Sequence, residues 1–469
     1  MNRRTFGSAA FTSIAPAFAQ ELPQPGKYEP TWESLRRHQP PQWYDDAKLG
    51  IFIHWGLYSV PAWAPPTGEL GKVDWSKWFY QNPYAEWYLN SIRLKESQTA
   101  AYHAKTYGAD FDYYRFVETF NREVEKWKPA EWATLCKQAG ARYVVLTTKH
   151  HDGFMMWPSR VPNPKRPGGL SVKRDLVGEL TGAVRAAGMK MGLYYSGGLD
   201  WTFETKPVAQ LPDLRTTAPQ SAEYAAYTDA HWRELIERYQ PTILWNDINY
   251  PKAGKLPEIF ADYYNKFPDG MVNNRFGVEH ADITTPEYAK YDKITEKKWE
   301  SCRGLGFSFG YNRIEGPEHV LASDKLIAML IDIVSKNGNL LLNIGPRPDG
   351  SISEIQLDRM HALGRWMNIN GEAIHGSRPW VRPGSGNVRF TRKGSAVYAL
   401  LLERPAAGTA IIPGVLAAEG SKIQALGAAE PLAFRQQGRD LAITIPANLP
   451  GEYALALKIE PRPYQVVQE

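Results

Sequence analysis

Cysteine is almost absent from this chain, with only Cys136 and Cys302 among 469 residues. Two thiols cannot build a disulfide framework, and they are too few for a thiolate metal centre. We interpret both as small apolar side chains, Cys136 in a helical segment and Cys302 in a strand. The sequence therefore argues against a disulfide-stabilised scaffold and against a cysteine-bound metal.

Blocks of one charge are lacking as well. The 55 basic and 50 acidic residues are mixed along the chain and leave a net charge of +5. Nucleic acids and anionic membranes bind continuous basic faces, so neither is expected as a partner. Beyond residue 19, no run approaches the ~20 apolar residues that span a bilayer. Instead, 43% hydrophobic and 22% charged residues indicate a globular protein with an ample core.

Aromatic residues, by contrast, are abundant. The chain has 16 Trp and 25 Tyr, and with Phe they make 12% of the sequence. Rings with a polar group fill cores and also stack on sugar faces. Several of them, including Trp63, Trp75, Trp78 and Trp87, lie in a long connection over residues 56–93. A connection of this length inside a compact domain is usually functional.

The N-terminus has the pattern of an export signal. Arg3 and Arg4 precede Thr5-Phe6, a weakly apolar stretch covers residues 8–17, and residues 17–19 (AFA) have the small-x-small form of a cleavage site. This predicts a twin-arginine-like signal peptide over residues 1–19. The mature protein is then expected to be periplasmic or secreted. A folded or disordered N-terminal arm is the alternative.

Buried strands alternate with amphipathic helices along most of the chain. Helices are expected at residues 129–140, 175–188, 222–239 and 256–267, with a further one around 326–334. Eight strands are expected, at residues 49–55, 142–149, 190–196, 242–248, 271–276, 282–288, 299–307 and 339–344. The count favours a (β/α)8-like (TIM) barrel over residues 20–380. A doubly wound sheet shows the same alternation and stays the alternative.

The sequence pattern changes beyond Trp380. Strand-length segments at residues 388–392, 396–402, 440–445 and 453–457 are separated by Gly and Pro and show no helical period. We interpret residues 381–469 as a C-terminal antiparallel β-sandwich domain.

Polar side chains collect at the carboxyl ends of the expected strands. His54 follows the first, residues 150–152 (HHD) the second, Asp200-Trp201 the third, and Arg275 lies at the fifth. The fourth strand delivers Asp247, and the period of two places Trp245 on the same face. Strand ends meet at one rim of a barrel, so these residues are expected to converge on one site.

Two chemistries fit such a rim. His54, His150, His151 and Asp247 could bind a metal ion that activates water. Alternatively, two carboxyl groups could flank a glycosidic bond, one attacking the anomeric carbon and the other donating a proton. Asp247 would be the nucleophile, and Glu86, Glu287 and Glu300 are the candidates for the acid.

Long blocks in order along the chain resemble the α-L-fucosidases of glycoside hydrolase family 29. The similarity runs from about Trp32 to the C-terminus. It is carried by residues 48–61 (KLGIFIHWGLYSVP), 82–88 (NPYAEWY), 148–154 (TKHHDGF), 173–177 (KRDLV), 194–201 (YYSGGLDW), 244–247 (LWND) and 338–346 (GNLLLNIGP).

This resemblance implies an exo-acting, retaining α-L-fucosidase with a barrel, a β-sandwich and neither metal nor cofactor. Its partners would be fucosylated oligosaccharides or glycoconjugates, and a homo-oligomer is compatible with it. The family nucleophile falls on Asp247 and the acid/base on Glu287, with Glu300 as the alternative. The implied substrate-binding residues are His54, Trp78, Glu86, Trp87, His150, His151, Tyr194, Trp245, Arg275 and Phe309. The rival functions are a metal-dependent barrel hydrolase and a non-catalytic fucose-binding protein.

Overall fold

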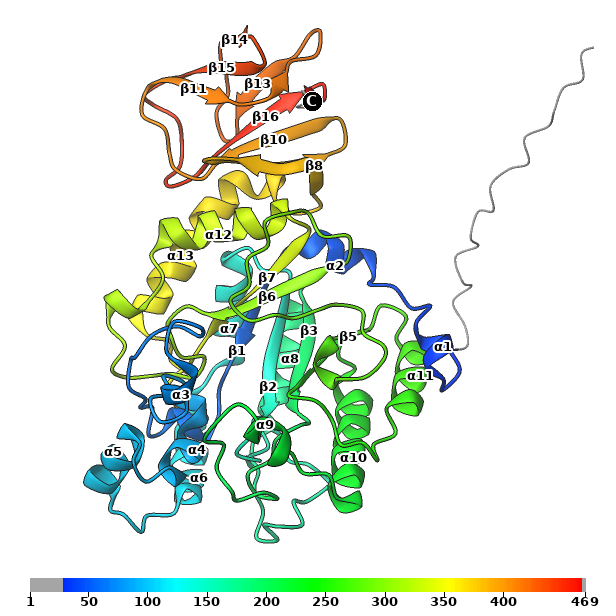
Figure 1. The fold of residues 1–469 in the computed structure, drawn as a ribbon, viewed down its shortest axis with the longest axis vertical. Helices are drawn as coiled ribbons and strands as arrows, with labels where there is room; N and C mark the ends of the chain where they lie inside the picture. Colours follow the sequence, from blue (N-terminus) through cyan, green and yellow to red (C-terminus); the bar gives the residue numbers. More distant parts are fainter. Residues whose placement is uncertain (1–27, 466–469) are drawn as a thin grey trace, which may run out of the picture.

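A sheet of seven parallel strands forms the centre of the molecule (Figure 1). The structure is a computed structural model, and it describes residues 28–465. The strand order is β5-β4-β3-β2-β1-β7-β6. The strands are β1 (Leu49–Ile53), β2 (Tyr143–Lys149), β3 (Lys190–Ser196), β4 (Ile243–Asp247), β5 (Met271–Val272), β6 (Trp299–Gly304) and β7 (Gly338–Ile344).

The gap between the edge strands β5 and β6 is bridged by residues 283–287. Ile283 forms a parallel bridge with Asn273, just after β5, while Thr284 and Glu287 pair with Trp299 and Cys302 of β6. The expected strand over residues 282–288 is therefore present as isolated bridges only. They link the two edges, and the fold is the predicted barrel in a (β/α)8-like form.

Two of the predicted strands end at least three residues before their expected ends. The strand predicted to reach residue 276 ends at Val272, because the Asn273 side chain takes over its pairing with β4. Its Oδ1 accepts from Asn246 N and its Nδ2 donates to Asn246 O, both at 3.0 Å. The chain then turns into the 3-10 helix η5 (Asn274–Phe276). The strand predicted to reach residue 307 ends at Gly304, where the backbone folds tightly against Gly306 and Ser308.

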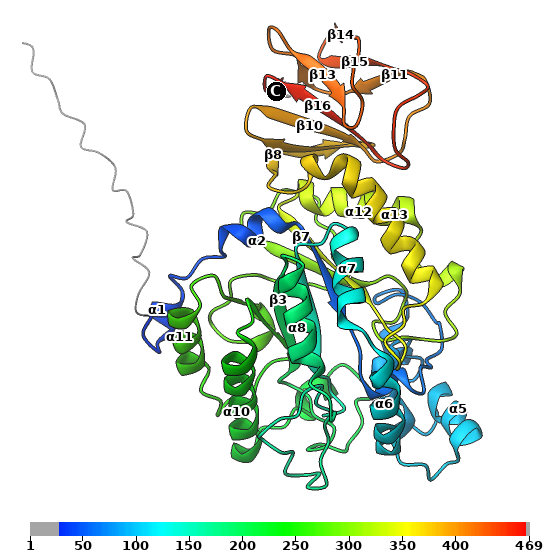
Figure 2. The same ribbon diagram turned by 180° about the vertical axis from the view of Figure 1, so that it is seen from behind.

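The helices between the strands begin at strong N-terminal signals. Asp175 and Ser221 cap α8 and α10 by accepting from backbone N–H groups at 2.9 and 3.1 Å, and Pro129 opens α7. Figure 2 shows α7, α8 and α10 on the outer side of the sheet. The helices are α7 (Pro129–Gln138), α8 (Leu176–Ala186), α10 (Ala222–Tyr239), α11 (Leu256–Lys266), α12 (Ser323–Ser335) and α13 (Glu354–Asn370). The sequence pattern did not identify α13.

Short helices occupy the N-terminal segment and the long connections. The segment before the barrel holds α1 (Trp32–Leu35) and α2 (Gln42–Ala47). The connection after β1 holds α3 (Trp75–Trp78), η2 (Ala85–Trp87), α4 (Tyr88–Arg93), α5 (Gln98–Tyr107) and α6 (Phe116–Glu123), and the one after β3 holds α9 (Asp213–Thr216).

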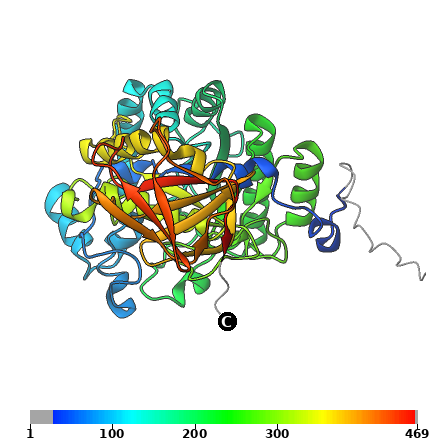
Figure 3. The same ribbon diagram turned by 90° about the horizontal axis from the view of Figure 1, so that it is seen from above.

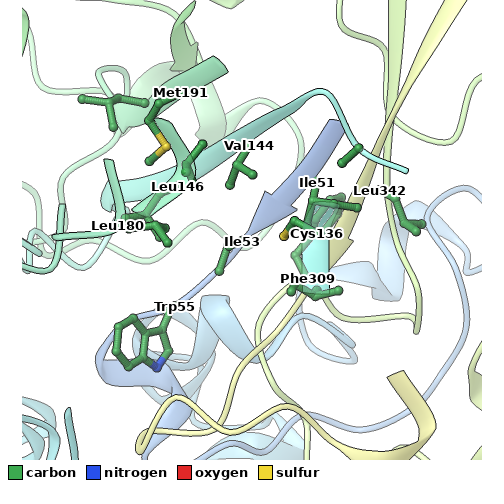
Figure 4. Close-up of a cluster of buried hydrophobic side chains, with 14 of the residues drawn as sticks. Ile51, Ile53, Trp55, Cys136, Val144, Leu146, Leu180, Met191, Phe309 and Leu342 are labelled. Atoms are coloured by element: carbon green, nitrogen blue, oxygen red, sulfur yellow. The ribbon is translucent and has the colours of Figure 1, made fainter. Parts of the chain in front are cut away.

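The strands of the barrel are buried on both faces. Ile51 and Ile53 of β1 point outward, and Figure 4 shows them in one cluster with Val144, Leu146 and the helix residue Leu180. Their neighbour Phe52 points inward and packs in a separate inner core with Tyr143, Val145, Tyr194, Trp245, Leu341 and Cys302. Such strands appear in the sequence as continuous apolar runs, which is why they were recognisable.

The C-terminal part consists of antiparallel sheets at the end of the barrel where β1 begins (Figures 1 and 3). A five-stranded sheet has the order β13-β16-β10-β9-β8, and a three-stranded sheet has the order β11-β15-β14. The strands are β8 (Arg378–Ser385), β9 (Val388–Lys393), β10 (Ala396–Leu401), β11 (Gly408–Ile412), β12 (Val415–Leu416), β13 (Lys422–Ala425), β14 (Phe434–Gln437), β15 (Asp440–Ile445), β16 (Leu455–Glu460) and β17 (Tyr464–Gln465).

One strand expected in this part is displaced along the sequence. It was predicted over residues 453–457 and lies at Leu455–Glu460, because Tyr453 has a φ of 62° and interrupts extended backbone. The division of the chain after residue 380 stays a prediction.

Strand β10 is buried on both faces. Val397, Ala399 and Leu401 lie in the core between the two sheets. The alternate residues Ala396, Tyr398 and Leu400 belong to the same apolar cluster as the barrel. The five-stranded sheet is thereby packed directly onto the barrel.

Three further expectations concern single segments. Cys136 in α7 and Cys302 in β6 are both buried and free, as predicted. Within residues 28–465, no helix combines the length and the apolar character needed to cross a bilayer. The predicted signal peptide at residues 1–19 lies outside the described residues.

Candidate active site

A pocket of about 230 Å³ opens at the carboxyl ends of the barrel strands. Every residue that the sequence assigned to catalysis or substrate binding lines it, except the alternative acid Glu300. These residues are His54, Trp78, Glu86, Trp87, His150, His151, Tyr194, Trp245, Asp247, Arg275, Glu287 and Phe309.

Asp247 is the last residue of β4, and its carboxylate is held from three sides. Tyr194 of the neighbouring strand β3 donates its hydroxyl to Oδ2 at 2.9 Å. Ile248 N and Arg275 Nη1 donate to Oδ1 at 3.0 and 2.8 Å. These contacts fix the orientation of the carboxylate at the edge of the pocket.

Arg275 connects the two predicted catalytic carboxyl groups through one atom. Its Nη1 contacts Asp247 Oδ1 at 2.8 Å and Glu287 Oε1 at 2.7 Å. Its Nε and Nη2 donate to the carbonyl of Thr285 at 3.1 and 2.9 Å, and its guanidinium lies 4.7 Å from the centre of the Trp245 ring. Each nitrogen of the guanidinium therefore has a hydrogen-bond partner. The side chain reaches these partners because Arg275 lies in the 3-10 turn η5, next to β4.

The charge of Arg275 determines the ionisation of Asp247. Burial favours the neutral acid, but the guanidinium of Arg275, aided by His151 and the Tyr194 hydroxyl, outweighs it and lowers the pKa of Asp247 below its ordinary value. Asp247 is therefore a carboxylate at neutral pH, which is the form in which it can act as a nucleophile.

Glu86 lies deep in the pocket on η2. Its Oε2 accepts from Gly310 N at 2.8 Å and from Ser308 Oγ at 3.2 Å. Burial raises the pKa of Glu86 to about 7, although these hydrogen bonds act in the opposite direction. Below that pH the carboxyl group carries a proton and can donate to a ligand hydroxyl.

The three histidines of the pocket are neutral at ordinary pH. Burial lowers the pKa of His54 to about 3 and that of His151 to about 4. His54 Nδ1 lies 2.6 Å from Asn343 Oδ1, which can only accept, so His54 carries its proton on Nδ1. Buried His150 Nδ1 has no hydrogen-bond partner among the described residues. His150 Nδ1 and His54 Nε2 therefore remain for polar groups of a ligand.

Aromatic rings form the walls. The ring of Trp87 packs edge-on against His151, with centroids 5.3 Å apart, and Phe309 lies 5.0 Å from His54. Trp78 and Tyr84 meet at right angles at 5.3 Å. A pocket with aromatic walls and a polar floor suits a ring that carries hydroxyls on its edges and C–H bonds on its faces.

Glu300 lies outside this pocket. It is fully buried within the barrel, where Oε2 accepts from Tyr44 OH at 2.7 Å and from Tyr143 OH at 2.5 Å. Its Oε1 accepts from Trp245 Nε1 at 3.0 Å. Burial raises the pKa of Glu300 in spite of these hydrogen bonds. The carboxyl group faces the back of Trp245 and supports that ring.

Two other acids of the predicted rim are engaged in the scaffold. Asp200 pairs with buried Lys149 at 2.8 Å, and Asp152 accepts from Tyr113 OH at 2.7 Å. Neither they nor Trp201 line the pocket.

The arrangement does not favour the metal alternative. Among residues 28–465, one group of three potential ligands converges, and it consists of His38, His280 and Asp282 rather than the pocket histidines.

Several pocket residues were missed. Phe52 could have been found, because it shares the inward face of β1 with His54. Cys302 is a predicted core residue, and its sulfur also lies 3.4 Å from Arg275 Nη2. The others are Leu70, Trp75, Phe79, Tyr84, Leu211, Leu214 and Ile248. The first four lie in the connection over residues 56–93 that was expected to be functional, whereas no sequence signal pointed to Leu211, Leu214 or Ile248.

Comparisons with known proteins agree with this geometry. The family model described as alpha-L-fucosidase matches residues 16–372, and that of the alpha-L-fucosidase C-terminal domain matches residues 384–460. Human tissue alpha-L-fucosidase is 34% identical over 455 residues, covering 93% of this chain and 92% of its own.

Solved structures are similar over the same length. The alpha-fucosidase of Thermotoga maritima in complex with fucose is 44% identical, with a TM-score of 0.83. The same enzyme in complex with a mechanism-based inhibitor gives 45% and 0.84. Each covers 92% of this chain and 100% of its own.

Proposed function

This chain belongs to the alpha-L-fucosidase family, and from that premise we propose how its residues carry out the reaction. The protein is a glycoside hydrolase that removes terminal α-L-fucose with retention of configuration. Retention requires two displacements at the anomeric carbon, and so two carboxyl groups with different roles.

Asp247 makes the first displacement. Its carboxylate attacks the anomeric carbon and forms a fucosyl-aspartate ester, while the bond to the leaving oxygen breaks. Glu287 transfers its proton to that oxygen, so the leaving group departs as a neutral alcohol.

Water makes the second displacement. Glu287, now a carboxylate, removes a proton from water as the water oxygen attacks the anomeric carbon. The ester bond to Asp247 breaks, fucose leaves, and both carboxyl groups return to their starting states.

The observation that carries this assignment is the contact of Arg275 Nη1 with both carboxyl groups, at 2.8 and 2.7 Å. Asp247 Oδ1 and Glu287 Oε1 both contact this nitrogen, so the distance between the two oxygens cannot exceed the sum of the two contacts. This upper limit supports the separation of ~5.5 Å found in retaining enzymes rather than the wider gap of inverting ones.

Fucose hydroxyls would be bound by the polar residues of the pocket floor. His54, His150, His151 and Glu86 offer neutral donors and acceptors, and Trp78 and Phe309 offer apolar surface for the sugar methyl group. A fit of this kind favours fucosylated oligosaccharides and glycoconjugates as substrates. The twin-arginine-like pattern at residues 1–19 supports a periplasmic or secreted location, which N-terminal sequencing of the exported protein would test.

Replacing the nucleophile tests the mechanism directly. In Asp247→Gly, hydrolysis of an aryl α-L-fucoside should be lost, because no carboxylate reaches the anomeric carbon. Added azide fits the vacated space and should restore turnover, with a fucosyl azide as the product, identified by mass spectrometry and NMR. Absence of rescue would argue against Asp247 as the nucleophile.

The rival functions predict other results for the unmodified protein. A non-catalytic fucose-binding protein would bind an aryl fucoside without releasing the aryl group. A metal-dependent hydrolase would lose its activity with EDTA, whereas two-carboxylate catalysis should continue unchanged.

A further inference from the structure

The entrance of the pocket is exposed and apolar. Within residues 28–465, few large apolar side chains have more than about a third of their surface exposed: Trp75, Leu211, Tyr291, Ile314, Val381, Ile411 and Tyr464. Two of them, Trp75 and Leu211, each 42% exposed, line this one pocket. Exposed apolar side chains that gather at a cavity usually mark a binding surface.

Two connections that are distant in sequence build the entrance. Leu70 and Trp75 come from the connection after β1, Leu211 and Leu214 from the one after β3, and Ile248 follows Asp247. We call these five residues the mouth.

Both sides of the mouth are supported by local structure. Asp74 caps α3 by accepting from Ser76 N at 2.8 Å, and the Trp75 ring lies 5.7 Å from that of buried Trp78. On the other side, Asp213 Oδ2 accepts from Ala209 N at 3.0 Å and from Gln210 N at 3.2 Å. The exposed side chains therefore stand on ordered turns.

The mouth differs in chemistry from the floor of the pocket, which is formed by His54, His150, His151, Glu86 and Asp247. The histidines, Glu86 and Asp247 are buried, and Glu287 and Arg275 are half-buried. The mouth residues are exposed or half-buried, and the acidic and basic side chains that line the pocket are Glu86, Asp247, Arg275 and Glu287. A ligand group held at the mouth would gain apolar contact and little hydrogen bonding.

We propose that the mouth is the binding site for the group to which fucose is attached, and that it selects leaving groups with an apolar face. The inference rests on the proposed function: when a terminal fucose fills the floor, its leaving group can extend only through the entrance. An aryl group and the C–H face of a pyranose share the required chemistry, since both stack on an indole ring. A leaving group charged on all sides would lose hydration there without gaining a partner.

The test compares substrates that share fucose but differ in the leaving group. The substrates are α-L-fucosyl fluoride, whose leaving group is a single atom, para-nitrophenyl α-L-fucoside and a fucosylated pyranose disaccharide. For Trp75→Ala, kcat/KM should fall about three- to tenfold on the aryl fucoside, the disaccharide or both, the size of one lost aromatic contact. It should be unchanged on the fluoride. Trp75→Phe keeps an aromatic face and should retain most of the activity.

Leu211→Ala should show the same pattern with a smaller loss. Ile411→Ala is the matched control, since Ile411 is 43% exposed on β11 in the C-terminal sheets and should affect no substrate. A loss on the aryl substrate alone assigns the mouth to flat aromatic groups, and a loss on the disaccharide alone assigns it to sugars.

Two outcomes would overturn the proposal. Equal losses on all three substrates would mean that Trp75 supports the floor, and no loss on either large leaving group would mean that the mouth binds nothing. Failure of the unmodified protein to hydrolyse the fluoride would instead refute the proposed function, so the two failures are distinct.

Discussion

Arg275 holds both proposed catalytic carboxyl groups with one nitrogen, and this determines what a substitution there would do. A lysine carries the same charge but lacks the second nitrogen and Nε that bind the Thr285 carbonyl. Its ammonium would not be fixed between Asp247 and Glu287. The geometry of the pair thus depends on the planar shape of the guanidinium as much as on its charge.

The two candidate acids can be separated by the leaving group they assist. For Glu287→Gln, we expect kcat/KM to fall far more on a fucoside with a poor leaving group than on one with a good leaving group, because only the poor one needs a proton. For Glu300→Gln, both substrates should be affected alike, through the hydrogen bond to Trp245 Nε1. Steady-state kinetics on the two substrates decide, and the opposite pattern would make Glu300 the acid.

Glu86 predicts a pH dependence of fucose binding. Burial raises its pKa to about 7, so the proton that it can donate is present below that pH and is lost as the pH rises through it. The affinity for fucose, measured by calorimetry, should therefore decline above pH 7. In Glu86→Gln the amide does not titrate, and this decline should be absent. The same decline in both proteins would show that another group is responsible.

At the scale of elements, β1 illustrates how closely the barrel interior is filled. Gly50 faces the Tyr143 ring on β2, and a methyl group added there would lie 2.3 Å from ring carbons. The hydroxyl of Tyr143 in turn binds Glu300, which supports Trp245 at the pocket wall. A single glycine in the first strand is thus connected to the active site through three side chains.

Two glycine substitutions test this packing. Gly50→Ala should reduce the free energy of unfolding by about 1–3 kcal/mol, because the ring or the strand must shift. Gly182→Ala is the matched control in α8, where an added methyl group meets no atom within 4 Å and should stabilise the helix by about 0.5–1 kcal/mol. Urea denaturation measures both. Equal effects would mean that the barrel interior can relax around the added carbon.

The elements differ in how far their sequence determined them. Fully buried parallel strands and capped helices were predictable, and α10 and β3 have the predicted bounds. The early end of β5 was not predictable, because the side chain of Asn273 takes the place of strand backbone in the pairing with β4. In the site, the period of two linked Trp245 to Asp247, whereas the choice of Glu287 among the three candidate acids came from the family resemblance. The contact of Arg275 with both Asp247 and Glu287 depends on the turn at η5, and no local sequence pattern predicts that contact.

At the scale of the whole molecule, the C-terminal sheets and the barrel share apolar surface and ion pairs. Trp366 of α13 donates to Ala454 O at 2.8 Å, and Arg389 of β9 pairs with Asp332 of α12 at 2.6 Å. Leu400 of β10 is fully buried in the cluster that continues into the barrel. We therefore expect the two parts to unfold in one transition.

Substitutions on the two faces of the five-stranded sheet test this coupling. Leu400→Ala should cost about 2–5 kcal/mol and lower the melting temperature of the whole protein, because it removes contacts shared by both parts. Leu457→Ala is the comparison variant, since Leu457 is equally buried but lies in the core between the sheets. It should lower the same single transition if the two parts unfold together. Calorimetry that resolves two transitions in the unmodified protein would contradict the single cooperative unit.

Because β10 is buried on both faces, the C-terminal sheets cannot be exchanged freely between proteins. A C-terminal part transplanted onto another catalytic domain would carry a bare face that includes Tyr398 and Leu400. That face would need a matching surface on its new host or would promote aggregation. Chimaeras should therefore exchange the barrel and its sheets together, and tolerated crossovers should fall in connections that avoid this shared face.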